Sequence, residues 1–258
     1  MSSTPLNYWQ PPPDFPFAKE QLPTMYDLPS EDPEEPGLPD EFHYYQPQLL
    51  RETFCPPDYP PEQICVATDL NLYYDLQHLA WYKRPDWFAV LGVPRFYEGH
   101  ELRYSYVVWQ EQVVPFIVLE LLSEGTESED LGQTVRDIKQ PPTKGHVYEQ
   151  ILQIPYYIVF GREANQLRVF HWQTGRYQTL TLSEEEKVWL PEIQLGIGLW
   201  HGAYQGLERQ WLRWYDAQHH WIPTPVEQLE QERQRAEQEH QRAERLAAQL
   251  RALGIEPQ

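Results

Sequence analysis

Two carboxylates and one ammonium group lie where this chain should be largely buried. Asp86 follows Pro85 at the start of an apolar segment, and Lys144 begins a segment with helical periodicity. Glu120 lies inside the apolar run FIVLELL, residues 116–122. A buried carboxylate without a partner is so costly that it normally takes up a proton, pairs with a cation or binds a metal. Glu120 is therefore the first candidate site residue.

Asp86 and Glu120 at the ends of neighbouring strands would form a site for a hard divalent cation. Mg²⁺ usually binds one or two carboxylates and completes its shell with water and phosphate oxygens. Such an ion can activate water and hold a scissile phosphate, while a protonated lysine stabilises the charge that develops on it. Taken singly, each residue also fits a structural role, such as a strand-end turn for Asp86, an ion pair for Glu120 and a solvated first-turn lysine for Lys144.

The residues around this triad predict the elements that position it. Three apolar segments, residues 84–94, 116–123 and 155–162, are typical of buried core strands. Residues 63–75 predict a further strand, and residues 100–115 a hairpin or strand-like excursion. Thr143 can cap a helix over residues 144–154. One face of this helix, at i, i+3, i+4 and i+7, consists of Lys144, Val147, Tyr148 and Ile151.

The remaining segments extend this core. Residues 40–54 predict a helix in which Pro47 causes a kink or a late start. Residues 166–182 predict a hairpin with Gly175 at the turn, and residues 187–202 and 210–216 add short strands. The predicted organisation is an acidic, Pro-rich arm over residues 1–40, one domain over residues 41–225, and a charged helix over residues 226–258.

The charged C-terminal helix has only a weak coiled-coil seam. Every seventh residue is Leu or Ala, at Leu229, Ala236, Ala243 and Leu250. The companion positions are Glu232, Glu239, Leu246 and Leu253, so only the last two heptads are apolar. A solvated single helix and a dimerising helix both remain open.

Composition limits the partners and the compartment. No apolar run approaches the roughly 20 residues that span a bilayer, so we expect no membrane association. The N-terminus lacks a secretory signal and there are two cysteines, which favours the cytoplasm. A formal net charge of -19 argues against a broad basic surface for nucleic acid, although a local basic strip remains open. Neither a dinucleotide fingerprint nor an HExxH motif nor a G-x-S-x-G elbow occurs.

Four segments together resemble the Uma-type endonuclease family. They are RPDWFAVLGV, PFIVLELLSEGTESEDLG, KGHVYEQILQIPYYIVF and GRYQTL, and the resemblance runs from about residue 65 to residue 222. That family lies in the PD-(D/E)xK restriction-endonuclease-like superfamily. The resemblance implies an α/β restriction-endonuclease-like fold, with a mixed sheet flanked by helices, an antiparallel extension and a C-terminal helix.

The resemblance also implies roles for individual residues. Asp86 and Glu120 match the metal ligands, and Lys144 matches the catalytic lysine. The lysine that the superfamily places two residues after the glutamate is Leu122 here. Lys139 is an alternative to Lys144, and an acidic residue of the first helix, Glu41 or Asp40, could complete the site.

The implied function is hydrolysis of phosphodiester bonds in DNA by an endodeoxyribonuclease dependent on Mg²⁺ or Mn²⁺. A homodimer would suit the cutting of both strands. One alternative is a catalytically inactive structural or interaction protein on the same fold, which assembles through the C-terminal helix. A second alternative is a nucleic-acid-binding module without hydrolysis.

Overall fold

A six-stranded mixed sheet forms the centre of the computed structural model, which describes residues 18, 21–24, 27, 41–122, 140–162 and 164–252. Its order is β1–β4–β6–β7–β8–β9. β6 and β7 are parallel, and the other neighbouring pairs are antiparallel. The strands are β1 (Ile64–Ala67), β4 (Trp87–Leu91), β6 (Ile117–Leu122), β7 (Tyr156–Gly161), β8 (Gln166–Gln173) and β9 (Arg176–Thr179).

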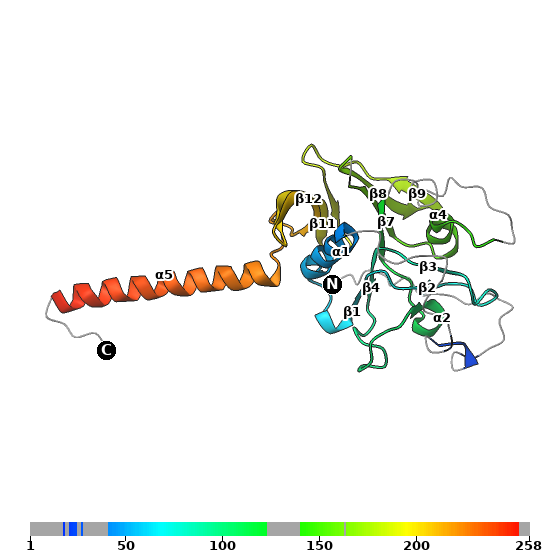
Figure 1. The fold of residues 1–258 in the computed structure, drawn as a ribbon, viewed down its shortest axis with the longest axis horizontal. Coiled ribbons are helices and arrows are strands. Elements are labelled where there is room, and N and C mark those ends of the chain that lie inside the picture. The colour runs from blue at the N-terminus through cyan, green and yellow to red at the C-terminus, as the bar shows by residue number, and fades with distance from the viewer. Residues whose placement is uncertain are drawn as a thin grey trace.

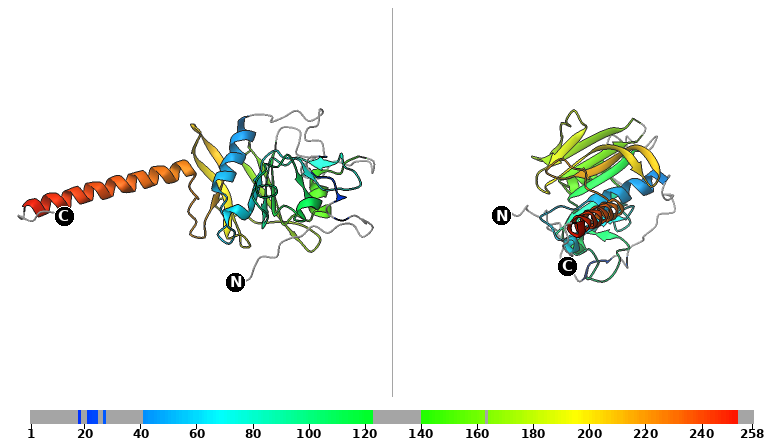
Figure 2. Two further views of the ribbon diagram at one scale, coloured as in Figure 1. Left: turned by 90° about the horizontal axis from the view of Figure 1, so that it is seen from below. Right: turned by 90° about the vertical axis from the view of Figure 1, so that its left-hand side faces the viewer.

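The two faces of this sheet bury separate cores. One face packs against α1 (Glu41–Thr53) and a second, antiparallel sheet of β10 (Lys187–Leu190), β11 (Leu195–Tyr204) and β12 (Leu207–Tyr215). The other face is covered by α4 (Lys144–His146) and η3 (Val147–Ile151) (Figures 1 and 2). β6 supplies Leu119 to the first core and Val118 to the second, because alternate side chains of a strand point to opposite faces. The restriction-endonuclease-like α/β fold is thus confirmed.

The predicted strand over residues 63–75 is wrong, because the segment divides into two strands in different sheets. Asp69 has a φ of 50°, and its N–H donates to Pro85 O at 3.1 Å. This left-handed residue ends the extended chain after β1. β2 (Leu72–Tyr73) then joins a small sheet with β3 (Tyr82–Lys83) and β5 (Tyr106–Val107). A short 3-10 turn, η2 (Pro61–Gln63), precedes β1.

Residues 100–115, predicted as a hairpin or a strand-like excursion, contain the short strand β5 and one helical turn, α2 (Val108–Glu111). Gln112 ends this turn in the left-handed region, with a φ of 60°. Trp109 and Gln110 of α2 bind the backbone of the N-terminal segment. Trp109 Nε1 donates to Pro23 O at 2.7 Å, and Gln110 Nε2 donates to Leu22 O at 2.8 Å. Part of the predicted arm therefore lies against the domain.

The helix that begins at Lys144 is capped by Thr143 as predicted, since Thr143 Oγ1 accepts from His146 N at 3.3 Å. Its second half, η3, is a π-helix in which Leu152 N donates to Val147 O at 2.9 Å. The wider turn shifts the buried face by one residue. Ile151, predicted to face the sheet, is 43% exposed, while Leu152 is buried.

The later segments match in part. The β8–β9 hairpin turns at Gly175, whose φ of 90° suits glycine. β11 and β12 are long strands of a separate sheet, whereas short strands were expected. α1 contains Pro47, and its buried Gln46 bridges to β12, with its Nε2 donating to Leu212 O at 2.9 Å.

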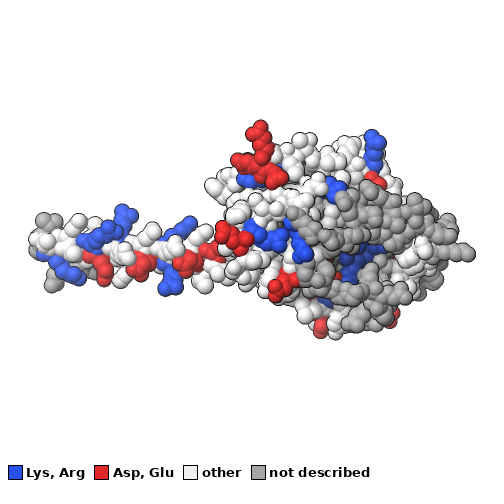
Figure 3. Space-filling model, turned by 45° about the horizontal axis from the view of Figure 1, so that its top comes forward, with Lys and Arg blue, Asp and Glu red and all other residues white. Residues whose placement is uncertain are grey.

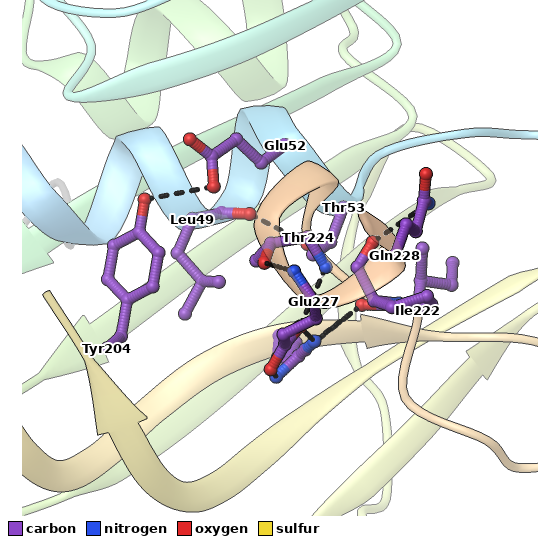
Figure 4. A network of polar contacts seen from close by, with 10 residues as sticks. Leu49, Glu52, Thr53, Tyr204, Ile222, Thr224, Glu227 and Gln228 are labelled. Carbon is purple, nitrogen blue, oxygen red and sulfur yellow. Dashed lines mark hydrogen bonds and ion pairs between the residues drawn. The ribbon is translucent and has the colours of Figure 1, made fainter. Parts of the chain in front are cut away.

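The last helix, α5 (Pro225–Ala252), extends away from the domain (Figure 1). Thr224 and Glu227 form a capping box at its start: Thr224 N donates to Glu227 Oε2 at 2.7 Å, and Glu227 N donates to Thr224 Oγ1 at 3.3 Å. Arg213 of β12 pairs with Glu227 and donates to Ile222 O at 2.8 Å, so the base of α5 is fixed to the second sheet. Figure 4 labels Ile222, Thr224 and Glu227 at this base. In the part of the chain that the structure describes, no helix is long and apolar enough to cross a membrane.

Candidate active site

The register of β4 and β6 brings the two predicted carboxylates together. Trp87 pairs with Leu119 across these antiparallel strands, so Asp86, one residue earlier, stands opposite Glu120. Residues directly opposite each other project from the same face of a sheet, with Cβ atoms about 4.5–5.5 Å apart. Asp86 is half-buried, and its Oδ2 accepts a hydrogen bond from Leu121 N at 2.6 Å. Glu120 is fully buried, with 0% exposure.

Both oxygens of Glu120 have partners from the helix that covers them. Lys144 Nζ lies 2.9 Å from Oε2, and the hydroxyl of Tyr148 donates to Oε1 at 2.7 Å. Lys144 and Tyr148 are four residues apart, so they project from one side of the helix. The buried Glu120 carboxylate in its apolar strand is therefore satisfied by the ammonium of Lys144 from α4 and the hydroxyl of Tyr148 from η3.

The backbone of Leu121 is held from both faces of the sheet. Its N–H binds Asp86, and its carbonyl oxygen lies 3.2 Å from Nε2 of the buried His43 on α1. α1 thus places a histidine, His43, against the backbone of β6 next to Glu120. Glu41, the acidic residue considered for this place, is exposed at the start of α1. Asp40 and Lys139 lie outside the described residues.

The structure therefore brings Asp86, Glu120 and Lys144 together on one face of the sheet. Tyr148 and His43 are neighbours that sequence reasoning did not place in the site. The i, i+4 spacing from Lys144 signals Tyr148, since both residues must share a helix face. No sequence signal identifies His43, because its position depends on how α1 packs across the opposite face.

Asp86 and Glu120 fit a hard divalent cation. Within the described ranges, no group of three or more His, Cys, Asp and Glu side chains could hold a metal ion. The protein ligands would therefore be these two carboxylates. Mg²⁺ needs no more than one or two, with water and phosphate oxygens as the remaining ligands. An ionised carboxylate offers about four lone pairs, so a carboxylate oxygen can accept a hydrogen bond, as those of Glu120 do from Lys144 and Tyr148, and also coordinate a cation.

Two arginines lie near the candidate site of this acidic chain. Arg84 Nε lies 2.7 Å from Asp69 Oδ1, close to Asp86 in the sequence. Arg168 pairs with Val159, which in turn pairs with Glu120, so Arg168 projects from the same sheet face two strands away. Arg84 is paired with Asp69 and Arg168 is partly buried, so a local basic strip stays a prediction.

Two further arginines lie on the other side of the sheet. The guanidinium carbons of Arg162 and Arg209 lie 5.9 and 4.2 Å from the centroid of the Phe42 ring, next to His43 in α1. On the face shown in Figure 3, Lys and Arg side chains lie on the globular part, while α5 carries both signs along its length. Lys and Arg side chains are therefore found both on the globular domain and on α5.

Comparison with known proteins adds one match. The model of the Uma2 family, described as "Putative restriction endonuclease", matches residues 20–208 of the chain. The match contains Asp86, Glu120 and Lys144, and it begins within the segment that packs against α2. No curated protein matches the chain.

Proposed function

The chain belongs to the Uma2 family of restriction-endonuclease-like proteins, and from this premise we propose that it is a metal-dependent nuclease that hydrolyses phosphodiester bonds in DNA. One observation carries the proposal. Asp86 and Glu120 stand side by side on one sheet face, and the ammonium of Lys144 lies 2.9 Å from Glu120. Three segments that are distant in the sequence thus supply the groups that phosphate hydrolysis needs.

Asp86 and Glu120 would hold Mg²⁺ or Mn²⁺, which when bound supplies Lewis-acid activation of water. Tyr148 donates to Glu120 and so fixes the orientation of its carboxylate. Lys144 keeps 25% of its side chain exposed, so its ammonium can reach a phosphate oxygen while it remains beside Glu120. There it stabilises the charge that develops on the phosphate as water attacks in line with the leaving oxygen.

The experiment is a cleavage assay on duplex DNA, single-stranded DNA and RNA with Mg²⁺ or Mn²⁺. The parent protein should cut DNA, and Asp86→Asn and Glu120→Gln should not. Glu208→Gln is the matched control, because the Glu208 side chain is 72% exposed on β12 and should be replaceable without loss. Cleavage that persists in both site variants would refute the proposal.

A second candidate function is a structural protein on the same fold, assembling through α5. It is favoured by the completed pairing of Glu120, since a carboxylate with two partners is stable without a metal. It is also favoured by exposed apolar residues on α5, where Leu229 is 67% and Leu246 is 52% exposed. This candidate predicts a dimer that Leu246→Lys dissociates, and a melting temperature that millimolar Mg²⁺ or Mn²⁺ leaves unchanged.

A homodimer is also compatible with the nuclease, because two sites can cut two strands. The mass of the protein in solution decides the oligomeric state, and the cleavage assay decides the activity. A monomer that cuts DNA would remove the role of α5 in assembly without affecting the proposed chemistry.

A further inference from the structure

A pocket of about 250 Å³ lies beside the candidate active site, on the same face of the central sheet. It is bordered by α4 and η3 on one side and by β7, β8 and β9 on the other. Its lining consists of Gly145, His146, Glu149, Tyr157, Phe170, Tyr177 and Thr179. Nothing in the proposed chemistry uses these residues.

The strand register places this pocket next to the carboxylates. Glu120 pairs with Val159 of β7, and Tyr157 lies two residues before Val159 on the same sheet face. Two residues of a strand span about 6.6 Å. Tyr157 pairs with Phe170, and Phe170 pairs with Thr179, so the floor of the pocket is the row beside that of Glu120.

Tyr148 connects the two rows. Its hydroxyl donates to Glu120 Oε1 at 2.7 Å, and its ring centroid lies 5.3 Å from that of Tyr157. Lys144 pairs with Glu120, and the next two residues, Gly145 and His146, line the pocket. The helix that supplies the ammonium to the site therefore also forms the pocket wall.

The pocket offers flat aromatic surfaces at its base. The ring centroids of Tyr157 and Phe170 are 5.9 Å apart, and those of Phe170 and Tyr177 are 6.2 Å apart. The Tyr177 hydroxyl donates to Ile154 O at 3.0 Å, which fixes its ring. Tyr157 is buried, whereas Phe170 and Tyr177 are partly exposed.

Polar groups stand at the rim. Glu149 Oε1 accepts from Tyr177 N at 2.6 Å, so the carboxylate is held in place at the pocket. His146 and Thr179 are exposed and can donate or accept hydrogen bonds. An aromatic base with a polar rim matches a ligand that has a flat apolar face and a hydrogen-bonding edge.

We propose that this pocket binds one unpaired nucleobase of the DNA, adjacent to the phosphate that is cut. The inference rests on the proposed function and specifies the form of its substrate. Pockets for drug-sized ligands measure roughly 300–1,000 Å³, so about 250 Å³ suits a single base. Every base has a π-face that stacks on aromatic side chains, and an extruded or single-stranded base exposes its edge for hydrogen bonds. The Glu149 carboxylate only accepts hydrogen bonds, which favours bases that carry an amino group.

The test compares binding of a fluorescent single-stranded oligonucleotide with binding of the same sequence as a duplex, with EDTA present to prevent cleavage. The full-length parent should bind the single strand more tightly. Phe170→Leu keeps an apolar side chain in the core but removes the π-face, and it should weaken single-strand binding by roughly tenfold to a hundredfold, the range for one lost base–aromatic stack. Duplex binding should change by less than about twofold, since no base leaves the stack.

Phe96→Leu is the matched control, because Phe96 is a partly exposed phenylalanine outside this pocket, and it should leave both affinities unchanged. A 2-aminopurine in the single strand adds a direct signal: its emission should fall on binding to the parent and not on binding to Phe170→Leu. If folded Phe170→Leu protein binds the single strand as tightly as the parent and quenches 2-aminopurine equally, the proposal that this pocket binds a base is wrong.

The two proposals fail in different ways. Mg²⁺-dependent cleavage with unaltered single-strand binding in Phe170→Leu would refute the pocket alone. Base-dependent binding without cleavage in any divalent metal would refute the proposed hydrolysis and leave the pocket standing.

Discussion

Two ion pairs hold charge in this molecule in opposite ways. In the pair at the candidate site, the acid is the buried partner: Glu120 has 0% side-chain exposure and Lys144 has 25%. At the base of α5, the cation is the buried partner: Arg213 has 4% side-chain exposure and Glu227 has 40%. Both arrangements satisfy the buried charge, yet only one of them has the composition of a catalytic site.

The pair at the base of α5 is explained completely by local structure. Arg213 donates to Ile222 O at 2.8 Å, and its guanidinium carbon lies 4.3 Å from the centroid of the Trp200 ring. Glu227 caps the helix that follows (Figure 4). Each group therefore has a structural task. The buried pair of Glu120 joins β6 to a helix 24 residues later in the sequence, and it stands opposite a second carboxylate, Asp86, which also binds Leu121 N.

The rate of DNA cleavage by site variants tests most strongly whether the two ion pairs differ in role. Asp86→Asn and Glu120→Gln each remove one ligand charge from the proposed metal site, and each should lower cleavage by about a thousandfold or more. Cleavage rates under single-turnover conditions measure this, with melting curves to show that both variants are folded. Arg213→Met should leave the cleavage rate of the folded protein unchanged. An equal loss of cleavage in all three variants would mean that the two pairs do not differ in role.

Arg213→Met should produce a large loss of stability. It removes the buried partner of a pair together with two hydrogen bonds to Ile222 O and the contact with Trp200. Losing the buried half of such a network costs about 3 kcal/mol of unfolding free energy. Urea denaturation measures it. A loss below about 1 kcal/mol would show that the base of α5 is held by other contacts.

Lys144→Met should reduce the cleavage rate by about a hundredfold to a thousandfold, since it removes one cation beside the developing charge. Its cost in unfolding free energy should match or exceed that of Arg213→Met, because it removes the cation beside the fully buried Glu120 carboxylate. Lys139→Met is the matched control. If Lys139→Met instead abolishes cleavage and Lys144→Met does not, the catalytic lysine is Lys139.

Tyr148→Phe removes one hydrogen bond to Glu120 and retains the ring that packs against Tyr157. Loss of this bond should cost about 1 kcal/mol of unfolding free energy, and the remaining bond from Lys144 should preserve most of the cleavage rate. Denaturation and cleavage measured on the same preparation test both statements. Unchanged stability would mean that the Tyr148 hydroxyl does not hold the Glu120 carboxylate.

The smallest effect should come from Glu227, the exposed partner in the second pair. Burial opposes its ionisation, but hydrogen bonds from Arg213 and Thr224 N outweigh this and lower the pKa of its carboxyl below the ordinary value of 4.5. The resulting stability is present above that value and is lost as the pH falls through the lowered pKa. Because water screens Glu227, Glu227→Gln should cost less than about 1 kcal/mol at pH 7. Melting curves should show that this difference shrinks as the pH falls below 4.5; a difference that grows on acidification would contradict the assigned direction.

Sequence patterns predicted the parts of the fold that depend on local periodicity. The apolar run around Glu120 became β6, and Thr143 capped the helix that carries Lys144. These features follow from side-chain alternation and capping chemistry, which a short window of sequence contains. The turn at Gly175 was predicted for the same reason.

The features of the fold and of the candidate site that were not predicted depend on tertiary contacts. The left-handed Asp69 that divides β1 from β2 has no glycine to signal it, and the π-turn of η3 moves Ile151 outward although its spacing is regular. The proximity of Asp86 to Glu120 was proposed from the sequence, but His43 could not be, because α1 reaches β6 only through packing across the sheet. Sequence reasoning therefore identified the candidate site residues better than the residues that support them.

Mn²⁺ binding measured by isothermal titration calorimetry tests the metal site most directly. The parent should bind Mn²⁺ at a site that both Asp86→Asn and Glu120→Gln abolish, while Glu227→Gln leaves the affinity unchanged. Mn²⁺ binding of equal affinity in the parent, Asp86→Asn and Glu120→Gln would contradict a metal site formed by these two carboxylates.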